Sequence, residues 1–450
     1  MSSPRLPSDS HPSSPGSMPR REFVAATTAA YLAAQLPADE PPGSERLALQ
    51  GGAKAVSTAL PPRVRWGAPE GARLEAMLQQ RSLFYWKGPQ TAALVERFRN
   101  LCPLQYVQTC SSGTAALHIA VAAAGIAPGD EVITTPITDV GTVIGVIYQQ
   151  GVPVFADLAP STYNLDPADV ERRITPRTKA IIAVHLCGNP CELRTLRELA
   201  DRNGLVLIED CAQAWGARYR GQPVGTFGHI ACFSLQDSKH VTCGDGGLVA
   251  SGDPRFGPRL QPFGDKGMDR TQGGGLFAHF ATNYRMSEPQ AAVAAAQLDR
   301  VPSIAGRRAQ LGNRLTAALR GIAGLVPHEV HPEDVCTYWF YYFRLQPAAW
   351  RCERGEFVKA LAAEGVPCSA GYIPVPLHRN PVFQQHGFFA GHWPVRDLGL
   401  TTMDYSQHTT PEAEAILQTG VRIAIYEQMD ESYVDQLAAG VRKVARYYAA

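Results

Sequence analysis

The chain has 450 residues, and its 42 lysines and arginines against 41 aspartates and glutamates leave a formal net charge of +1. This length is more than one small core needs, so we expect a large domain and a smaller one, while the balanced charge gives no electrostatic reason to expect nucleic acid or an anionic membrane as a partner. The ten cysteines are scattered singly, and the pair Cys187 and Cys191 has no second pair at zinc spacing, so we expect no metal site and a reducing compartment.

Residues 1–45 are expected to form a disordered tail, because residues 1–17 are rich in serine and proline. Arg20 and Arg21 precede the short apolar run "EFVAATTAAYLAAQLPA", which resembles a twin-arginine export signal, although an amphipathic N-terminal helix fits the same residues. No stretch of about eighteen apolar residues occurs, so we expect no membrane span. The expectation is a cytoplasmic protein, with export through this signal as the alternative.

Residues 46–300 are predicted to form a large α/β domain. Between Pro103 and Ser251, runs that are apolar on both faces suit strands buried in a mainly parallel sheet: "DEVITTP", "VPVFADL", "KAIIAVHL", "GLVLIED", "IACFSL" and "GGLVAS". The stretches "TAALHIAVAAAGI" and "LRTLRELADRNG" between them have helical apolar spacing and place a glycine at or near the end, as helix C-termini often do. This alternation predicts a doubly wound domain.

Residues 301–450 are predicted to form a smaller α+β domain. Long helical segments lead into it from "NYRMSEPQAAVAAAQLDRVPSIAGRRAQLGNRLTAALRGI". The aromatic run "CTYWFYYFRLQ" is predicted as a strand and "RGEFVKALAAEGV" as a helix. The last thirty residues are expected to form one or two further helices.

Ligands of open α/β sheets lie beyond the carboxyl ends of the strands, so the polar residues that follow the apolar runs are the candidates for a site. In "TCSSGTAALHIA" a Ser-Gly-Thr sequence opens a helix, which suits a phosphate but also makes an ordinary cap. Asp210 and His185 end two other runs, where a helix cap and a structural hydrogen bond are the alternatives. Ser234 ends a further run, and Lys239 follows it in a stretch where a solvated surface lysine would be the ordinary interpretation.

One ligand needs these features together. Pyridoxal phosphate requires an anion site for its phosphate, a carboxylate that keeps its ring nitrogen protonated, and a lysine amine that binds its aldehyde. The joint occurrence of the Ser-Gly-Thr turn, Asp210 and Lys239 in this order therefore favours a pyridoxal phosphate site over three unrelated structural roles.

From about Leu47 to its C-terminus, the sequence resembles the DegT/DnrJ/EryC1/StrS family of aminotransferases, also called sugar aminotransferases. The matching blocks, in order, are "SSGTAALHIAVAAAGIAPGDEVITTP", "GVPVFADL", "YNLDP", "AVHLCGNP", "IEDCAQAWGARYRGQPVGTFG", "CFSLQDSKHVTCGDGG" and "NYRMSEPQAAVAAAQL". The resemblance implies a fold of the aspartate aminotransferase type (fold type I), pyridoxal 5'-phosphate as cofactor, and a homodimer with shared active sites. Its reaction would be amino transfer in amino sugar biosynthesis.

Carried over position by position, the resemblance makes Lys239 the Schiff-base lysine and Asp210 the partner of the ring nitrogen, the two catalytic residues. The other residues that it assigns to the cofactor are Ser112, Gly113, Thr114 and Ser234 for the phosphate, Gln213 near the ring oxygen, and Asn283 from the neighbouring subunit. Asp139 departs from the family, which usually has an aromatic residue there to stack on the ring, and an aspartate has no aromatic face. It would instead hydrogen-bond a cofactor or substrate group.

The expected amino donor is L-glutamate or L-glutamine, and the acceptor implied by the resemblance is a nucleotide-linked keto-sugar or a keto-cyclitol. Candidate substrate contacts, for each of which a structural role is at least as good an interpretation, are Trp86, His185, Tyr338, Trp339, Tyr372 and His378. Two alternatives stay open: another pyridoxal phosphate reaction on the same scaffold, such as a dehydration or an aromatisation, and a regulatory relative that binds the cofactor without turnover.

Overall fold

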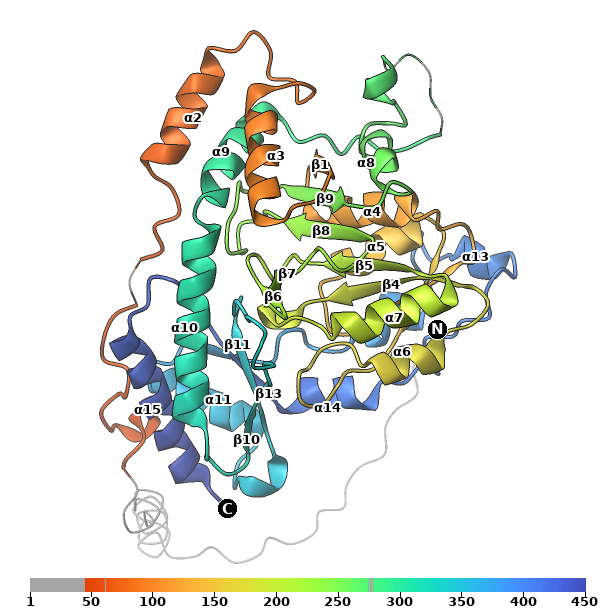
Figure 1. Ribbon diagram of the computed structural model, residues 1–450. Helices are drawn as coiled ribbons and strands as arrows, with labels where there is room; N and C mark the ends of the chain where they lie inside the picture. Colours follow the sequence, from red (N-terminus) through yellow and green to blue (C-terminus); the bar gives the residue numbers. More distant parts are fainter. Residues whose placement is uncertain (1–44, 61, 274, 276, 278) are drawn as a thin grey trace, which may run out of the picture. The chain divides into compact units, whose positions relative to one another are not determined.

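The computed structural model describes residues 45–450 except 61, 274, 276 and 278 (Figure 1). The predicted N-terminal tail with its possible export signal lies outside the described residues. The fold of the described chain is built around two sheets, a large one from the first half of the sequence and a small antiparallel one near the C-terminus.

The large sheet has seven strands in the order β1-β9-β8-β5-β4-β2-β3. The pairs from β8 to β3 are all parallel, whereas β9 runs antiparallel to both of its neighbours. The strands are β1 (Tyr106–Cys110), β2 (Glu131–Thr134), β3 (Val152–Phe155), β4 (Thr178–Val184), β5 (Val206–Asp210), β8 (Ile230–Ser234) and β9 (Gly247–Ser251). The predicted mainly parallel α/β sheet is confirmed.

Helices cover both faces of this sheet, which explains why its strands are apolar throughout. On β5, Leu207 packs into the core beneath α3, α6, α7 and α9, while Ile208 packs into the core beneath α4, α5 and α8. These helices are α3 (Pro89–Leu101), α4 (Gly113–Ala123), α5 (Gly141–Tyr148), α6 (Pro167–Arg173), α7 (Leu193–Asn203), α8 (Gly257–Gly264) and α9 (Glu288–Leu298). Helix α2 (Ala68–Leu78) lies at the edge of the view in Figure 1, and β6 (Arg218–Tyr219) and β7 (Gln222–Pro223) form a separate two-stranded sheet.

The small sheet has the order β10-β11-β13-β12, and its pairs are all antiparallel. Its strands are β10 (Leu325–Pro327), β11 (Tyr341–Leu345), β12 (Cys368–Ala370) and β13 (Gly420–Ile423). One face packs in a common core with α10 (Val301–Leu319), α11 (Arg354–Ala363) and α15 (Glu431–Tyr448). The opposite face is turned to a layer of aromatic side chains that also includes residues after β4.

Helix α10 starts at Val301, where the domain boundary was predicted, and takes part in both cores (Figure 1). Val301 and Ile304 pack with the large sheet, whereas Leu311 belongs to the core of the small sheet. Leu47 also packs in this second core. In the opposite sense, the C-terminal segment with α12 (Pro381–Gln384) and α13 (Pro394–Asp397) packs against β3 of the large sheet. The division into domains at residue 300 stays a prediction.

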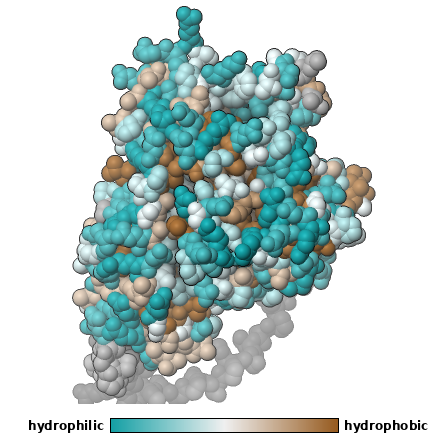
Figure 2. Space-filling view, in the orientation of Figure 1, coloured by the Kyte–Doolittle hydropathy of each residue, from teal (hydrophilic) through white to brown (hydrophobic). Residues whose placement is uncertain are grey.

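The secondary structure predicted from the sequence differs from the observed one mainly in the C-terminal part. The aromatic run is a strand only from Tyr341, and β13 lies in a stretch that we expected to be helical; the helix expected there is α15. Helix α14 (Pro411–Thr419) immediately precedes β13. Among the helices that the structure describes, none is long and apolar enough to cross a membrane. On the face shown in Figure 2, hydrophobic residues form small groups between hydrophilic ones.

Candidate active site

Lys239 follows β8 and is buried, with 8% of its surface exposed. Its Nζ lies 4.0 Å from the centroid of the Trp339 ring, and within the described residues no hydrogen bond or ion pair reaches this nitrogen. Burial lowers the pKa of Lys239, whereas the nearby carboxylates of Asp210 and Asp139 act to raise it. The neutral amine is therefore favoured here more than it is for a lysine in water.

The loop that carries Lys239 is held from outside by Arg65. The Arg65 guanidinium donates to the backbone carbonyls of Asp237 and Lys239. The Arg65 carbonyl in turn accepts hydrogen bonds from Gln297 Nε2 at 2.7 Å and from Arg300 Nη1 at 2.8 Å. These contacts fix the backbone that carries the Lys239 side chain, and Arg65 was not among the predicted site residues.

Asp210 is the last residue of β5, and only 3% of its surface is exposed. Its Oδ2 accepts a hydrogen bond from Thr142 Oγ1 at 2.9 Å, and its Oδ1 accepts one from the backbone N–H of Ala212 at 3.1 Å. Burial raises the pKa of Asp210, while these hydrogen bonds and the charge of Lys239 act to lower it. A carboxylate this deeply buried is stabilised by a cationic group beside it.

Thr142 belongs to α5 and supports Asp210 from the side of the sheet that this helix covers. Its Oγ1 also lies 2.8 Å from Thr138 Oγ1, so three side chains form one hydrogen-bonded row that ends at the carboxylate. Thr142 was not among the predicted site residues. Its position in the first turn of a helix that follows a parallel strand was the available signal.

An anion-binding cradle lies where α4 begins, directly after β1. Ser112 caps the helix, and its Oγ accepts the N–H of Ala115 at 3.0 Å. The N–H groups of Gly113 and Thr114 lie in the first turn and have no partner inside the helix. A Cβ atom at Gly113 would be 2.7 Å from the Ser234 Cβ, so only glycine lets the helix begin this close to the end of β8. The free N–H groups and the helix dipole together suit a phosphate.

Gln213 and Tyr372 line the other side of the site. The Gln213 amide donates from Nε2 to the Tyr372 hydroxyl at 3.3 Å, and its Oε1 accepts the N–H of Cys187 at 3.0 Å. The Tyr372 ring packs 5.7 Å from Trp339 and 5.1 Å from Phe340, centroid to centroid. We call Trp339, Phe340 and Tyr372 the aromatic cluster; it closes the site on the side of the small sheet.

Trp339 reaches Lys239 because its backbone is tied to the loop after β4. Its N–H donates to the Cys187 carbonyl at 2.8 Å, and its indole Nε1 donates to the Ser238 carbonyl at 2.8 Å. Gly188, at a φ of +87°, allows this approach, since a Cβ atom there would lie 2.8 Å from Thr337 Oγ1.

Asp139 lies at the start of α5, exposed at the mouth of the site. Its Oδ1 accepts the N–H of Gly141 at 2.8 Å. Its carboxylate acts to raise the pKa of Tyr372 and also that of Lys239, where it opposes the larger lowering effect of burial. The structure therefore places a negative charge, and no aromatic face, at this position beside the amine.

His185 comes directly after β4 but its ring turns away from Lys239. Nδ1 accepts the N–H of Cys191 at 3.1 Å, so the proton is on Nε2, which lies 3.2 Å from Glu209 Oε2. Glu209 also accepts backbone N–H groups of the turn that includes Gly225 and Phe227. The donor atoms of His185, Glu209 and Cys211 lie within 4.8 Å of one another, but because those of His185 and Glu209 are already hydrogen-bonded, the cluster is better explained as structural than as a metal site.

Two other candidate substrate contacts are packed away from Lys239. Tyr338 is buried in the core of the small sheet, where its ring stacks on Tyr341 and its hydroxyl donates to Asn313 Oδ1 at 2.8 Å. His378 is buried next to Phe155 of β3, and burial lowers its pKa to about 3. In this structure neither side chain faces the amine.

Trp86 and Asn283 also lie outside the group around Lys239. Trp86 is half-buried with its ring 6.1 Å from that of Tyr85. Asn283 is exposed, and its Oδ1 accepts the N–H of Arg285 at 3.3 Å. Both are placed on the surface of a single chain, where a second subunit would have access to them.

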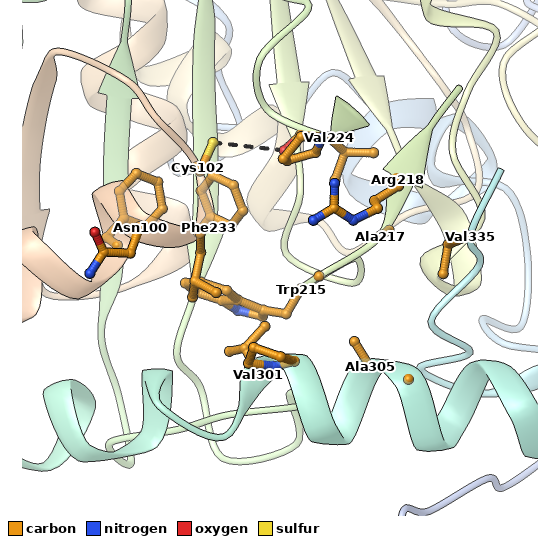
Figure 3. A pocket seen from close by; sticks show the side chains of 16 residues that line it. Asn100, Cys102, Trp215, Ala217, Arg218, Val224, Phe233, Val301, Ala305 and Val335 are labelled. Carbon is orange, nitrogen blue, oxygen red and sulfur yellow. Dashed lines mark hydrogen bonds between the residues drawn. The ribbon is translucent and has the colours of Figure 1, made fainter. Parts of the chain in front are cut away.

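A cavity of about 350 Å³ is lined by residues other than Lys239, Asp210 and Gly113 (Figure 3). Trp215, Phe233 and Val301 line it, with the rings of Trp215 and Phe233 4.8 Å apart, and Ala305 of α10 lies at its lower side in this view (Figure 3). The Trp215 indole donates to the Ser234 carbonyl at 2.7 Å. Trp215 therefore connects this cavity to Ser234, the residue against which the anion-binding cradle is packed.

The residues around Lys239 fit pyridoxal phosphate. An amine without a partner, a buried carboxylate that favours a cation, and the free N–H groups of a helix start match the aldehyde, ring nitrogen and phosphate of this one group. Because Gly113 has no side chain, the start of α4 can lie directly against Ser234 at the end of β8.

Comparisons with known proteins identify relatives of this chain in sequence and in fold. A putative L-glutamine:3-amino-2,3-dideoxy-scyllo-inosose aminotransferase of Streptomyces kanamyceticus is 34% identical over 358 residues, which are 78% of this chain and 85% of the relative. The GDP-perosamine synthase of Escherichia coli O157:H7 is 32% identical over 358 residues, 78% of this chain and 92% of the relative. In the solved structure of S. venezuelae DesV, which is 31% identical in sequence, the fold matches with a TM-score of 0.73 over 84% of this chain and 94% of that chain.

A comparison with models of protein families identifies the family of this chain. Residues 67–442, which include every residue of the site described above except Arg65, match the model of one family. Amino transfer is the activity of that family, and both the large parallel sheet and the small antiparallel sheet have counterparts in its solved structures. The chain belongs to the DegT/DnrJ/EryC1/StrS aminotransferase family.

Proposed function

We propose that this enzyme transfers an amino group from L-glutamate or L-glutamine to a keto-cyclitol or a nucleotide-linked keto-sugar, with pyridoxal phosphate bound at Lys239. The observation that carries the proposal is the convergence of Lys239, Asp210 and the start of α4 at one edge of the large sheet. When bound there, the cofactor supplies an aldehyde that takes up the amino group and a ring that accepts electrons.

Asp210 would keep the ring nitrogen of the cofactor protonated. Its carboxylate is buried, and within the described residues its hydrogen bonds come from Thr142 and Ala212, which are neutral donors. A positive charge in contact with it would relieve the cost of its burial. Thr142 fixes the orientation of the carboxylate, so that the charge stays aimed at the same place throughout the reaction.

Lys239 would hold and move a proton at its Nζ. For this the amine has to be neutral near pH 7, and burial lowers its pKa in the required direction. The Trp339 face, 4.0 Å from Nζ, excludes water on one side of the amine. The free N–H groups of Gly113 and Thr114 would meanwhile bind the phosphate, which anchors the cofactor during proton transfer.

The acceptor class is inferred from the relatives and from the charge of the site. One relative is named for a cyclitol ketone and another for a GDP-linked sugar, so both classes are candidates for this chain. Asp139 places a negative charge at the mouth of the site. This charge favours an uncharged or amine-bearing cyclitol over an acceptor with a diphosphate.

A homodimer with shared active sites is part of the proposal. Asn283 and Trp86 are placed on the surface of the chain, and large hydrophobic side chains near Asn283 in the sequence are exposed, among them Phe280 at 98% and Phe277 at 57%. Exposed apolar side chains of this size are typical of interfaces. A second copy would cover them and receive Asn283 at its own site.

Product analysis tests the proposed reaction. The purified enzyme, loaded with pyridoxal phosphate, is incubated with L-glutamine or L-glutamate and either a keto-cyclitol or a nucleotide-linked keto-sugar. We expect an aminated product from one acceptor class together with the oxo acid of the donor. A dehydrated or aromatised product, or binding of the cofactor without turnover of any donor, would contradict the proposal.

A further inference from the structure

The turn that carries Lys239 is held by hydrogen-bond donors from distant parts of the sequence. The two residues before Lys239, Asp237 and Ser238, are exposed. The carbonyls of Asp237 and Lys239 accept hydrogen bonds from the Arg65 guanidinium, and the Ser238 carbonyl between them accepts one from the Trp339 indole at 2.8 Å. Three successive carbonyls of the turn are therefore bound by two side chains that lie outside the large sheet.

The backbone of Arg65 is fixed as well, so its guanidinium acts from a rigid base. Its carbonyl accepts hydrogen bonds from Gln297 Nε2 at 2.7 Å and from Arg300 Nη1 at 2.8 Å. Both of these side chains also donate to the buried carboxylate of Glu70. A movement of the Lys239 turn therefore has to break its hydrogen bonds to Arg65 or displace this whole group.

Arg65 lies near the end of a segment, residues 46–66 apart from 61, that also binds to the core of the small sheet. Glu364 at the end of α11 is fully buried and accepts the N–H of Ala48 at 2.7 Å and the N–H of Ala55 at 2.9 Å. The segment thus connects the core of the small sheet with the turn of the lysine.

Stability alone would not favour an arginine in the setting of Arg65. The side chain is half-buried, its acceptors are neutral carbonyls, and within the described residues no ion pair reaches it. Burial, and after it the charge of Arg63, lowers the pKa of Arg65 to about 10; Arg308 adds to this effect, while Asp237 and Glu427 oppose it. A charge kept at such a cost indicates a demand on geometry, because a planar guanidinium binds two acceptors in fixed directions.

We propose that Arg65 is a positioning residue for Lys239: it binds the carbonyls on both sides of Ser238 and thereby keeps the amine in its buried place against the Trp339 ring. The inference rests on the proposed role of Lys239 in amino transfer. It adds a residue outside the stretch 67–442 that matches the family model. Arg65 acts through the backbone of the turn.

Loss of Arg65 would leave two carbonyls of an exposed turn without their donor, so the Lys239 side chain would be free to leave its buried place. Burial is the largest cause of the lowered pKa of Lys239, and Asp210 and Asp139 oppose it; the adjacent His240 stays neutral because burial lowers its pKa too. An amine that reaches water regains the ordinary lysine pKa of about 10.4. A smaller fraction of it would then be neutral and able to attack an aldehyde near neutral pH.

The first experiment measures the Lys239 amine in the cofactor-free protein. Wild type, Arg65→Met and Arg65→Lys are pulse-labelled with acetic anhydride over a range of pH, and mass spectrometry quantifies acetylation of the peptide that contains Lys239. We expect the labelling curve of Arg65→Met to move to higher pH, toward that of a free lysine. Arg65→Lys should lie between the two, because an ammonium group has no fork that spans both carbonyls.

Arg63→Met is the matched control, because Arg63 lies two residues earlier in the same segment. Its guanidinium carbon is 4.4 Å from the centroid of the Tyr426 ring, and its buried Nε and Nη2 have no hydrogen-bond partner among the described residues. Its removal takes away the same charge without touching the turn. Labelling of Lys239 in Arg63→Met should therefore follow the wild type.

The second experiment follows the absorbance of the bound cofactor after the loaded enzyme is mixed rapidly with L-glutamate or L-glutamine. At saturating donor, Arg65→Met should slow the change about 10- to 100-fold, the scale of a misplaced reacting group. The half-saturating donor concentration should change less than about threefold, since Arg65 is not expected to contact the donor. The rise of the rate with pH should move to higher pH, and Arg65→Lys should recover part of the rate.

The labelling curves decide between positioning and a merely structural role. A lower melting temperature of Arg65→Met with an unchanged labelling curve, or an equal shift of the curve in Arg63→Met, would overturn the inference. If Arg65→Met does not fold, the comparison of Arg65→Lys with Arg63→Met decides in the same way. Should no donor react with the wild type, amino transfer itself would be contradicted, while labelling of the cofactor-free protein would still show whether Arg65 positions Lys239.

Discussion

At the scale of single residues, the site depends on two ionisable side chains, Lys239 and Asp210, whose burial disfavours their charged forms. Burial lowers the pKa of Lys239 and raises that of Asp210, and the two side chains partly offset each other because each acts on the pKa of its partner. We expect these two buried groups to lower the stability of the cofactor-free protein, and we expect a bound cofactor to restore it.

Asp210→Asn is expected to make the cofactor-free protein more stable at neutral pH. Because the pKa of Asp210 is raised on folding, the native state holds its proton more tightly than the unfolded state, and stability falls as the pH rises through this range. The gain from asparagine should shrink toward pH values below about 3.9, the pKa of an unfolded aspartate, where both states are protonated. Thermal melts of both proteins at several pH values measure this difference in stability.

The same variant should be nearly inactive. Amino transfer is expected to fall by about 10²-fold or more, the scale of removing one fixed electrostatic contact. Asp245→Asn, in the loop before β9, is a suitable control, since Asp245 takes no part in the contacts of Asp210. A variant that lost stability at pH 7, or kept full activity, would contradict the role given to this carboxylate.

At the scale of elements, the site exists because parallel strands end at one edge of the sheet. Strands β1, β5 and β8 bring Gly113, Asp210 and Lys239 there from distant parts of the sequence. The start of α4 can approach the end of β8 only because Gly113 has no Cβ atom. A substitution at Gly113 therefore tests how closely the start of α4 is packed against the end of β8.

Gly113→Ala is expected to destabilise the protein by about 1–3 kcal/mol, the range for overpacking, because the new Cβ would lie 2.7 Å from that of Ser234. It should also weaken binding of pyridoxal phosphate by shifting the N–H groups of the cradle. Gly306→Ala in α10 is the matched control: no atom lies within 4 Å of its added Cβ, so a gain of about 0.5–1 kcal/mol is expected. Urea unfolding compares the two variants, and an equal response would contradict this account.

Most strands of the large sheet and the residues at their ends could be predicted from the sequence, because buried parallel strands are apolar throughout and short. Lys239, Asp210 and Gly113 are brought together in the structure as expected. Arg65 could not be found in this way. It lies outside the strands of the large sheet, and its hydrogen bonds to the loop that carries Lys239 join residues far apart in the sequence.

Aromatic and histidine candidates were harder to place. The run that contains Tyr338 and Trp339 sends one ring into a core and the other to Lys239. The difference is decided by the backbone of Tyr338, whose φ is +43°, and by the pairing of Trp339 with Cys187. Residue type does not contain this information, because the pairing joins residues far apart in the sequence.

At the scale of the whole molecule, the proposal requires that two copies complete each other's sites. Asn283 is exposed on the single chain. The small net charge of +1 and large exposed side chains such as Phe280 are compatible with association. Under this proposal, each site is complete only in the dimer. Complementation between two inactive variants tests the point directly.

An equal mixture of Lys239→Ala and Asn283→Ala, unfolded together and refolded, is expected to regain activity. Half of the randomly assorted dimers would be hybrids with one intact site out of two, so about a quarter of wild-type activity should return. Each variant refolded alone provides the control. Activity no higher than the sum of the two separate samples would show that Asn283 does not serve the neighbouring subunit.

The most direct test of the central claim is to find the residue that holds the cofactor. The protein loaded with pyridoxal phosphate is reduced with borohydride, digested and analysed by mass spectrometry, with Lys239→Arg as control. We expect the mass of the cofactor on the peptide that contains Lys239 and no labelled peptide from the variant. Label on any other lysine of the wild type, or none at all, would contradict the account.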